Sequence, residues 1–293
     1  MKPWAEDEKI YCLREAKVFR SNLEGVACER FFYKVDGLSP DEIKLIEQVI
    51  IEQSPEYSKT AIRRFLTLYS LAPELKRLYS DRLAPDSLSN LDDLIANFSE
   101  DYHEKIENKL LVFLNSMLAG NIDFYSDRKQ AGDFLYAICL QYTRTKQVRE
   151  ALLSQIGTTF IGCDVKRLFG PLSHIIAMKL AESLYCDRQR FTVILIDNST
   201  DTPFLAADQP IVNLHATFDG KPPERIEFFY PLSPAKAMLL VDSPNGADQQ
   251  PISAVSVNRY NVLMIQNSHE QVFSNSGEYL ASIAPVTRNK LGA

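Results

Sequence analysis

The sequence lacks the short motifs that mark the common catalytic sites. Its 293 residues contain no G-x-x-x-x-G-K-[ST], no G-x-G-x-x-G, no G-x-S-x-G and no H-E-x-x-H. No internal repeat or low-complexity segment occurs either. The usual signatures of phosphate-binding loops, dinucleotide folds, serine hydrolases and zinc proteases are therefore missing, and function has to be sought in less regular features.

Histidine and cysteine are scarce and scattered. The four histidines are His103, His174, His215 and His269. The five cysteines are Cys12, Cys28, Cys139, Cys163 and Cys186. No two histidines have metal-ligand spacing, and the odd number of cysteines forms no C-x-x-C pair, which argues against a zinc site and a disulfide framework. A Mg²⁺ or Mn²⁺ site made of carboxylates needs no fixed spacing, so it stays open.

Long hydrophobic runs are also absent. No apolar stretch reaches the 18 residues that a membrane span would need, and the N-terminal MKPWAEDEK lacks the apolar core of a signal peptide. We expect a cytoplasmic protein with no membrane partner, because scattered free cysteines suit a reducing compartment.

Positive charge is in the minority but is concentrated. The net charge of −6 argues against a general nucleic-acid coat, since phosphate binding leaves a basic footprint. Residues 141–190 nevertheless hold eight Lys or Arg against four Asp or Glu, so the rest of the chain sums to −10. This segment is either a solvated mixed-charge surface or a local anion site. Nucleic acid is possible as a partner but is not favoured.

Helical periodicity dominates the middle of the chain. Residues 8–20 predict two short strands around a turn, and Ser39-Pro40-Asp41-Glu42 predicts a helix start. Helical spacing continues to about residue 187. The last helix of this part is expected to begin after Pro171.

After residue 187 the pattern becomes strand-like. Strands are predicted at Phe191–Ile196, Ile226–Tyr230, Ala237–Val241 and Asn261–Ile265. The fold class is therefore α+β: an N-terminal strand pair, a long helical middle and a C-terminal, mostly antiparallel β region. We predict a single unit over 1–293, helical over about 39–187 and β over about 188–284.

The stretch Arg128–Ile156 is predicted to be one amphipathic helix that organises the fold. Gln141, Thr145 and Arg149 fall within its apolar stripe, and Arg144 lies on its flank. A buried guanidinium is costly unless it is paired, so this helix requires a partner for Arg149.

Asp208 is the candidate partner. It ends a short apolar strand directly before Gln209-Pro210, and we expect it to face the arginines. The pair is either a structural ion pair or part of a pocket in which Arg144 and Arg149 hold a phosphate or carboxylate. His174 is either a local hydrogen-bonding residue or a ligand or general base.

Four segments resemble the bacterial domain-of-unknown-function family 4238. They are Val26–Tyr33, Gln141–Arg149, Phe204–Val212 and Phe229–Leu240. Ala207 stands where that family usually has Ser, and Gln209 where it has Asn. The family's His-rich N-terminal segment is missing, so the chain is expected to be truncated there or to belong to a branch that lost it.

The resemblance implies a shared fold and a shared polar site, but no established activity. It suggests Gln141, Arg144 and Arg149 as ligand-binding residues and Asp208 as the catalytic one. We expect a pocket for a small anionic or phosphate-bearing ligand, in a hydrolytic effector of toxin or phage-defence type. The alternative is a non-catalytic module that binds a protein partner, in which the Arg/Asp cluster is structural.

Overall fold

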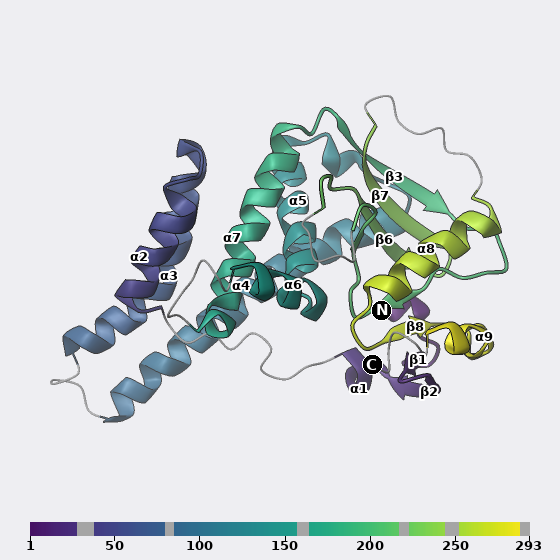
Figure 1. Ribbon diagram of the computed structural model, residues 1–293, viewed down its shortest axis with the longest axis horizontal. Coiled ribbons are helices and arrows are strands. Elements are labelled where there is room, and N and C mark those ends of the chain that lie inside the picture. Colours follow the sequence, from purple (N-terminus) through teal and green to yellow (C-terminus); the bar gives the residue numbers. More distant parts are fainter. Residues whose placement is uncertain (28–37, 80–84, 157–163, 217–222, 244–251, 288–293) are drawn as a thin grey trace.

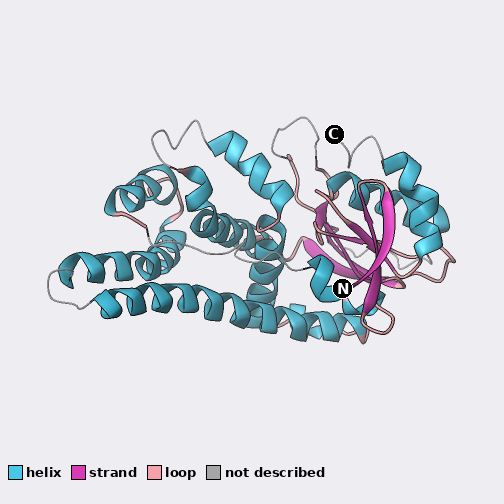
Figure 2. Ribbon diagram, turned by 90° about the horizontal axis from the view of Figure 1, so that it is seen from below, coloured by secondary structure: helices cyan, strands magenta, loops and turns pink. Residues whose placement is uncertain are grey.

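The computed structural model describes residues 1–27, 38–79, 85–156, 164–216, 223–243 and 252–287. Helices fill one end of the molecule (Figure 1), and Figure 2 shows the strands gathered at the other end with further helices beside them. The helical elements are η1 (Lys2–Trp4), α1 (Leu23–Ala27), α2 (Pro40–Ile46), η2 (Glu47–Ile51), α3 (Glu56–Tyr79), α4 (Pro85–Leu118), η3 (Asp123–Tyr125), α5 (Arg128–Thr143), α6 (Lys146–Ile156), α7 (Val165–Cys186), α8 (Ala254–Asn267) and α9 (Gly277–Thr287). The strands are β1 (Lys9–Arg14), β2 (Lys17–Asn22), β3 (Phe191–Asp197), β4 (Ala206–Ala207), β5 (Val212–Asn213), β6 (Phe228–Ser233), β7 (Lys236–Asp242) and β8 (Val272–Ser274).

The strands form two antiparallel sheets. One has the order β2-β1-β8-β4 and the other β3-β7-β6-β5. Strand β1 pairs with β8 so that Cys12 lies opposite Phe273, which joins the N-terminal strand pair to the C-terminal region. The prediction of an α+β fold with an antiparallel C-terminal part is confirmed.

The second sheet packs against helices on both of its faces. Side chains alternate between the two faces of a strand, so neighbouring residues contact different helices. Phe228 and Met238 belong to the apolar cluster that also contains buried residues of α4, α5 and α7. Their neighbours Phe229 and Ala237 belong to a different cluster, with Val257 of α8. Helix α5 thereby forms the centre of the protein, since it packs on α4, on α7 and against the sheet.

The start of α2 shows how the local sequence decides an element boundary. The backbone N–H of Glu42 donates to Ser39 Oγ at 3.3 Å, and the backbone N–H of Ser39 donates to Glu42 Oε2 at 2.8 Å. These reciprocal bonds satisfy two N–H groups that a helix start leaves open. The predicted helix start at Ser39-Pro40 is confirmed.

The predicted single helix over Arg128–Ile156 is wrong. It is two helices, since α5 ends at Thr143 and α6 begins at Lys146. The chain turns at Arg144 and Thr145, both of which are buried, and the hydroxyl of Thr145 donates to the side-chain oxygen of Gln209. A tertiary contact has thus overridden the helical period, and Gln141 and Arg149 lie on different helices.

Two further boundaries differ from prediction. Asn261–Ile265, predicted as a strand, lies inside α8, because Ser253 caps that helix and Val257, Asn261 and Met264 form its buried face at helical spacing. Helix α7 begins at Val165 rather than after Pro171, which lies within it. Residues 28–33 of the segment Val26–Tyr33 lie outside the described residues. No helix in the described part is both long and apolar enough to cross a membrane.

Candidate functional site

Asp208 holds the loop that precedes β8. Its Oδ1 accepts a hydrogen bond from the backbone N–H of His269 at 2.9 Å, and its Oδ2 accepts from those of Glu270 and Gln271 at 2.6 and 3.0 Å. The backbone N–H of Asp208 donates in return to the carbonyl of Gln271 at 3.1 Å. A carboxylate that accepts three main-chain bonds fixes the path of the chain.

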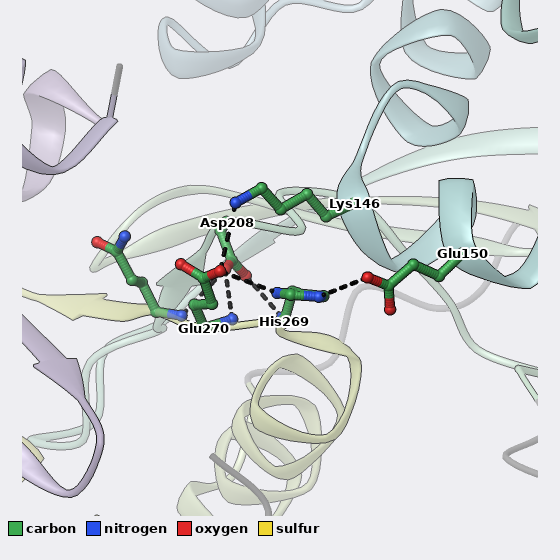
Figure 3. A network of polar contacts seen from close by, with 6 residues as sticks. Lys146, Glu150, Asp208, His269 and Glu270 are labelled. Carbon is green, nitrogen blue, oxygen red and sulfur yellow. Dashed lines mark hydrogen bonds and ion pairs between the residues drawn. The ribbon is translucent and has the colours of Figure 1, made fainter. Parts of the chain in front are cut away.

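Helix α6 docks on the same loop through two polar side-chain contacts (Figure 3). Lys146 Nζ lies 3.3 Å from Glu270 Oε1, and Glu150 Oε1 lies 3.1 Å from His269 Nε2. These side chains are partly or fully exposed, so each contact adds little stability. Asp208 and α6 therefore meet through this loop.

The predicted residues of the Arg/Asp cluster have separate environments. The guanidinium of Arg149 lies over the ring of Phe169, 5.3 Å from its centroid, which is a cation–π geometry. Gln141 is half-buried on α5. Arg144 is only 5% exposed, and its Nη1 lies 3.5 Å from Glu107 Oε1 on α4. Among the described contacts, Asp208 binds main-chain N–H groups and Arg149 contacts the ring of Phe169. These contacts give no support to the expected direct pair between Asp208 and Arg149.

Arg144 instead lies beside a buried chain of hydrogen-bonding side chains, which we call the Tyr–His chain: Tyr102, Tyr136, His174 and His103. The hydroxyls of Tyr102 and Tyr136 are 3.2 Å apart, and that of Tyr136 lies 2.9 Å from His174 Nδ1. Nε2 of His174 lies 3.4 Å from Nε2 of His103. The chain connects α4, α5 and α7 and reaches a fully buried imidazole.

Both imidazoles of the Tyr–His chain are neutral near pH 7. Burial and, to a smaller extent, the charge of Arg144 lower the pKa of His103 to about 3. Burial also lowers the pKa of His174 well below its usual range, with contributions from His103 and then Arg144. Burial raises the pKa of Tyr136. The chain therefore transmits hydrogen-bond direction without carrying a charge of its own.

The separation of the two Nε2 atoms also resembles the spacing of two imidazoles on a tetrahedral metal ion. However, the buried charge of Arg144 opposes a cation at this position. Among the described residues, no group of three His, Cys, Asp or Glu side chains lies where it could hold a metal ion. A hydrogen bond between neutral imidazoles accounts for the contact.

A cavity of about 650 Å³ opens between α4 and α5 at the tyrosine end of the chain. It is lined by Tyr102, Lys105, Ile106, Asn108, Lys109, Val112, Asp133, Tyr136 and Ala137. Apolar side chains and tyrosine rings supply most of its wall, and two lysines supply positive charge. This is a concave surface in which apolar area is combined with polar and charged side chains, as in many small-molecule sites.

Residues 170–278 match the family model described as "Protein of unknown function (DUF4238)". That segment belongs to the DUF4238 family. It runs from α7 to the start of α9 and includes Phe204–Val212 and Phe229–Leu240, two of the four segments on which the resemblance rested. No curated protein and no solved structure matches the chain.

The DUF4238 segment contains Asp208 and His174, whereas Gln141, Arg144 and Arg149 precede it. Sequence reasoning proposed His174 as an alternative ligand or base and missed Tyr102, Tyr136 and His103. The one local signal was the spacing of His103 and Glu107, which places both on one face of α4, toward Arg144. The other contacts join residues far apart in sequence.

Replacement of Thr145 by valine tests the contact that breaks the predicted long helix. The valine keeps the shape but removes the donor, leaving the buried oxygen of Gln209 without it. We expect the free energy of unfolding to fall by about 1 to 3 kcal/mol, measured by urea denaturation. Thr67→Val, at an exposed position of α3, is the matched control and should change little. Equal effects of the two variants would show that the contact does not stabilise the corner.

Proposed function

We propose that this protein binds a small molecule with an apolar body and a carboxylate or phosphate group in the cavity between α4 and α5. The cavity itself carries the proposal, because it combines an apolar wall with the end of the buried Tyr–His chain. Its volume falls within the range of about 300 to 1,000 Å³ that is typical of ligand pockets.

Charge on the cavity wall favours an anion. Lys109 Nζ is paired with Asp133 Oδ2 at 3.0 Å, so these two charges offset each other. Lys105 also lines the cavity and makes no ion pair within the described part of the chain. One positive charge therefore remains for the ligand, in a protein whose net charge is −6.

The apolar part of the wall favours a ring or a short hydrocarbon. Ile106, Val112 and Ala137 present carbon surface, and the rings of Tyr102 and Tyr136 adjoin it. A ring that packs on this wall removes apolar surface of both the ligand and the protein from water, which stabilises binding. Benzoate and phenyl phosphate are the simplest probes with both features.

The contacts of Asp208 support a structural role for this residue within the proposal. All the hydrogen bonds recorded for its carboxylate hold the main chain of 269–271. The anion class expected from the arginines is kept, but the binding residues proposed here are Lys105, Tyr102 and Tyr136.

Thermal shift and titration calorimetry with benzoate, phenyl phosphate, benzyl alcohol and benzylamine test the proposal. A ligand at about a hundred times its Kd should stabilise the fold by about 2.7 kcal/mol, which is a clear rise in Tm. We expect this for benzoate or phenyl phosphate and not for benzylamine.

Lys105→Ala should weaken binding of the anionic probe about twofold to fivefold, because one charge pair with an exposed lysine is lost. The matched control is Lys17→Ala, on the exposed end of β2, which should bind like the unmodified protein. If none of the probes shifts Tm, or if both variants bind equally well, the cavity is not an anion site of this kind.

A further inference from the structure

Strand β3 is an open edge of the second sheet. The order β3-β7-β6-β5 leaves its outer side without a neighbouring strand, and Figure 1 shows β3 at the margin of the sheet beside β7. It pairs with β7 along its whole length of seven residues, Phe191–Asp197. A long and regular edge of this kind is a template for a further strand.

The outward backbone groups of β3 belong to Val193 and Leu195. The backbone N–H of Asn198 donates to the carbonyl of Ala235 at 2.8 Å, one position beyond the end of the register with β7. Bonded and non-bonded pairs alternate in an antiparallel ladder, so the even-numbered residues of β3 bond to β7 and the odd-numbered ones point outward. Within the described part of the chain, no backbone group bonds to the N–H or C=O of Val193 or Leu195.

The other edges of the two described sheets are less suited to pairing. Strands β4 and β5 have only two residues each. Strand β2 carries Lys17 and Arg20, and charged side chains of this kind protect an edge from association. Strand β3 contains no proline, no bulge in its register and no charged residue before Asp197. It therefore lacks the usual protection of an edge.

We propose that β3 pairs antiparallel with β3 of a second copy of this chain, about a two-fold axis through Ile194, so that two four-stranded sheets form one continuous sheet. In this register Val193 bonds to Leu195 of the partner subunit, and Leu195 bonds to Val193 of the partner subunit. Each of these residues gives one N–H and one C=O, so the two copies form four main-chain hydrogen bonds.

The side chains of β3 suit this register. Ile194 lies opposite Ile194 of the partner subunit, and Thr192 lies opposite Ile196 of the partner subunit, so β-branched residues meet across the interface. Thr192 and Ile196 are only half-buried in one chain, and pairing would cover them further. Centring on Ile194 also overlaps all seven residues of both strands, whereas any shift shortens the ladder.

Charge at the ends of β3 favours a second copy in the antiparallel direction. Residues 187–190 hold two Arg and one Asp, whereas residues 197–201 hold two Asp and no base. The side chains of Arg190 and Asp197 remain 62% and 78% exposed beside their ion-pair partners on β7. Antiparallel pairing brings the basic end of each strand beside the acidic end of the other, and parallel pairing would bring like ends together. A two-fold contact also uses each edge once and closes, so it forms a dimer rather than a fibre.

The mass of the purified protein in solution tests the proposal. Size-exclusion chromatography with light scattering and sedimentation equilibrium both measure it. We expect twice the mass of one chain at about 100 µM protein, which a Kd in the micromolar range would give. The mass of a single chain at this concentration would overturn the inference.

Leu195→Pro tests whether the edge of β3 holds the dimer. It removes an N–H that the proposed interface uses and that has no partner within the described chain. It should weaken the dimer about thirtyfold or more, since two bonds are lost by symmetry and the ring occupies the edge. Leu195→Ala is the matched control, because it shortens the side chain but keeps the N–H, and it should remain a dimer. A dimer that survives Leu195→Pro uses another surface and overturns the inference.

Ile194→Cys tests the register and decides the question if Leu195→Pro does not fold. The Cα atoms of a non-hydrogen-bonded antiparallel pair are about 4.5 Å apart, a separation that a disulfide spans. In a Cys186→Ser background, which removes an exposed native thiol, oxidation should join two copies through position 194. Arg20→Cys, at an exposed position of the β2 edge, is the matched control and should not cross-link. No cross-link at position 194, or equal cross-linking at both positions, would overturn the inference.

Discussion

Asp208→Ala is expected to lower the free energy of unfolding by about 3 to 5 kcal/mol, because a charged acceptor is removed from three main-chain N–H groups. These amides belong to the turn between α8 and β8. Strand β8 in turn pairs with both β1 and β4, so this turn positions the middle of the first sheet. Urea denaturation with linear extrapolation measures the loss.

Graded variants separate the structural role of Asp208 from a catalytic one. Asp208→Asn keeps one accepting oxygen but places an amide donor against the remaining N–H groups, so it should be nearly as unstable as the alanine variant. Asp201→Ala, at an exposed turn, is the matched control and should change stability by no more than about 0.5 kcal/mol. A stable Asp208→Ala protein that no longer turns over or binds its ligand would return Asp208 to the catalytic role expected from the sequence.

The elements that sequence predicted well are those decided by local chemistry. The helix start at Ser39 depends on a serine and a glutamate three residues apart, whose bonds form within a single turn. The strand at Phe191–Ile196 depends on a continuous β-branched and apolar run, which favours a strand, although β3 lies at the edge of its sheet and only Val193 and Ile194 are buried. Both patterns are complete in a short window, so no tertiary information is needed.

The elements that it predicted wrongly depend on distant partners. The break between α5 and α6 depends on Gln209, 64 residues from Thr145. The strand expected at Asn261–Ile265 is helix α8, whose buried face becomes visible only when Val257 and Met264 are considered together. A short apolar run fits a strand and a buried helix equally well.

The candidate site was partly predictable for the same reason. The sequence indicated that Arg149 would be a buried charge in need of a counterpart, whereas the structure buries Arg144, which lies beside Glu107, and leaves Arg149 partly exposed. The sequence could not show that the neighbouring polar groups are His103 and His174, since they are 71 residues apart and share no motif. The cavity likewise arises from the packing of two helices, which no single segment reveals.

Acidification should destabilise the protein before its carboxylates titrate. The folded state holds His103 and His174 neutral, with their pKa values lowered mainly by burial, whereas both take up a proton near pH 6.5 when the chain unfolds. The unfolded state then binds more protons below this pH, so the stability present above it is lost as pH falls toward the folded-state pKa values. For two such groups, the loss between pH 7 and pH 5 is about 3 to 4 kcal/mol.

The window from pH 7 to pH 5 isolates the buried histidines, because ordinary Asp and Glu side chains remain ionised throughout it. The measurement is a series of urea denaturation curves across this range. His103→Gln combined with His174→Gln should start from a lower stability and show a nearly flat profile, since no buried base remains to be protonated. His215→Gln, which alters a histidine outside the Tyr–His chain whose side chain is 38% exposed, should keep the steep profile. A flat profile for the unmodified protein would mean that the fold does not hold the two imidazoles neutral.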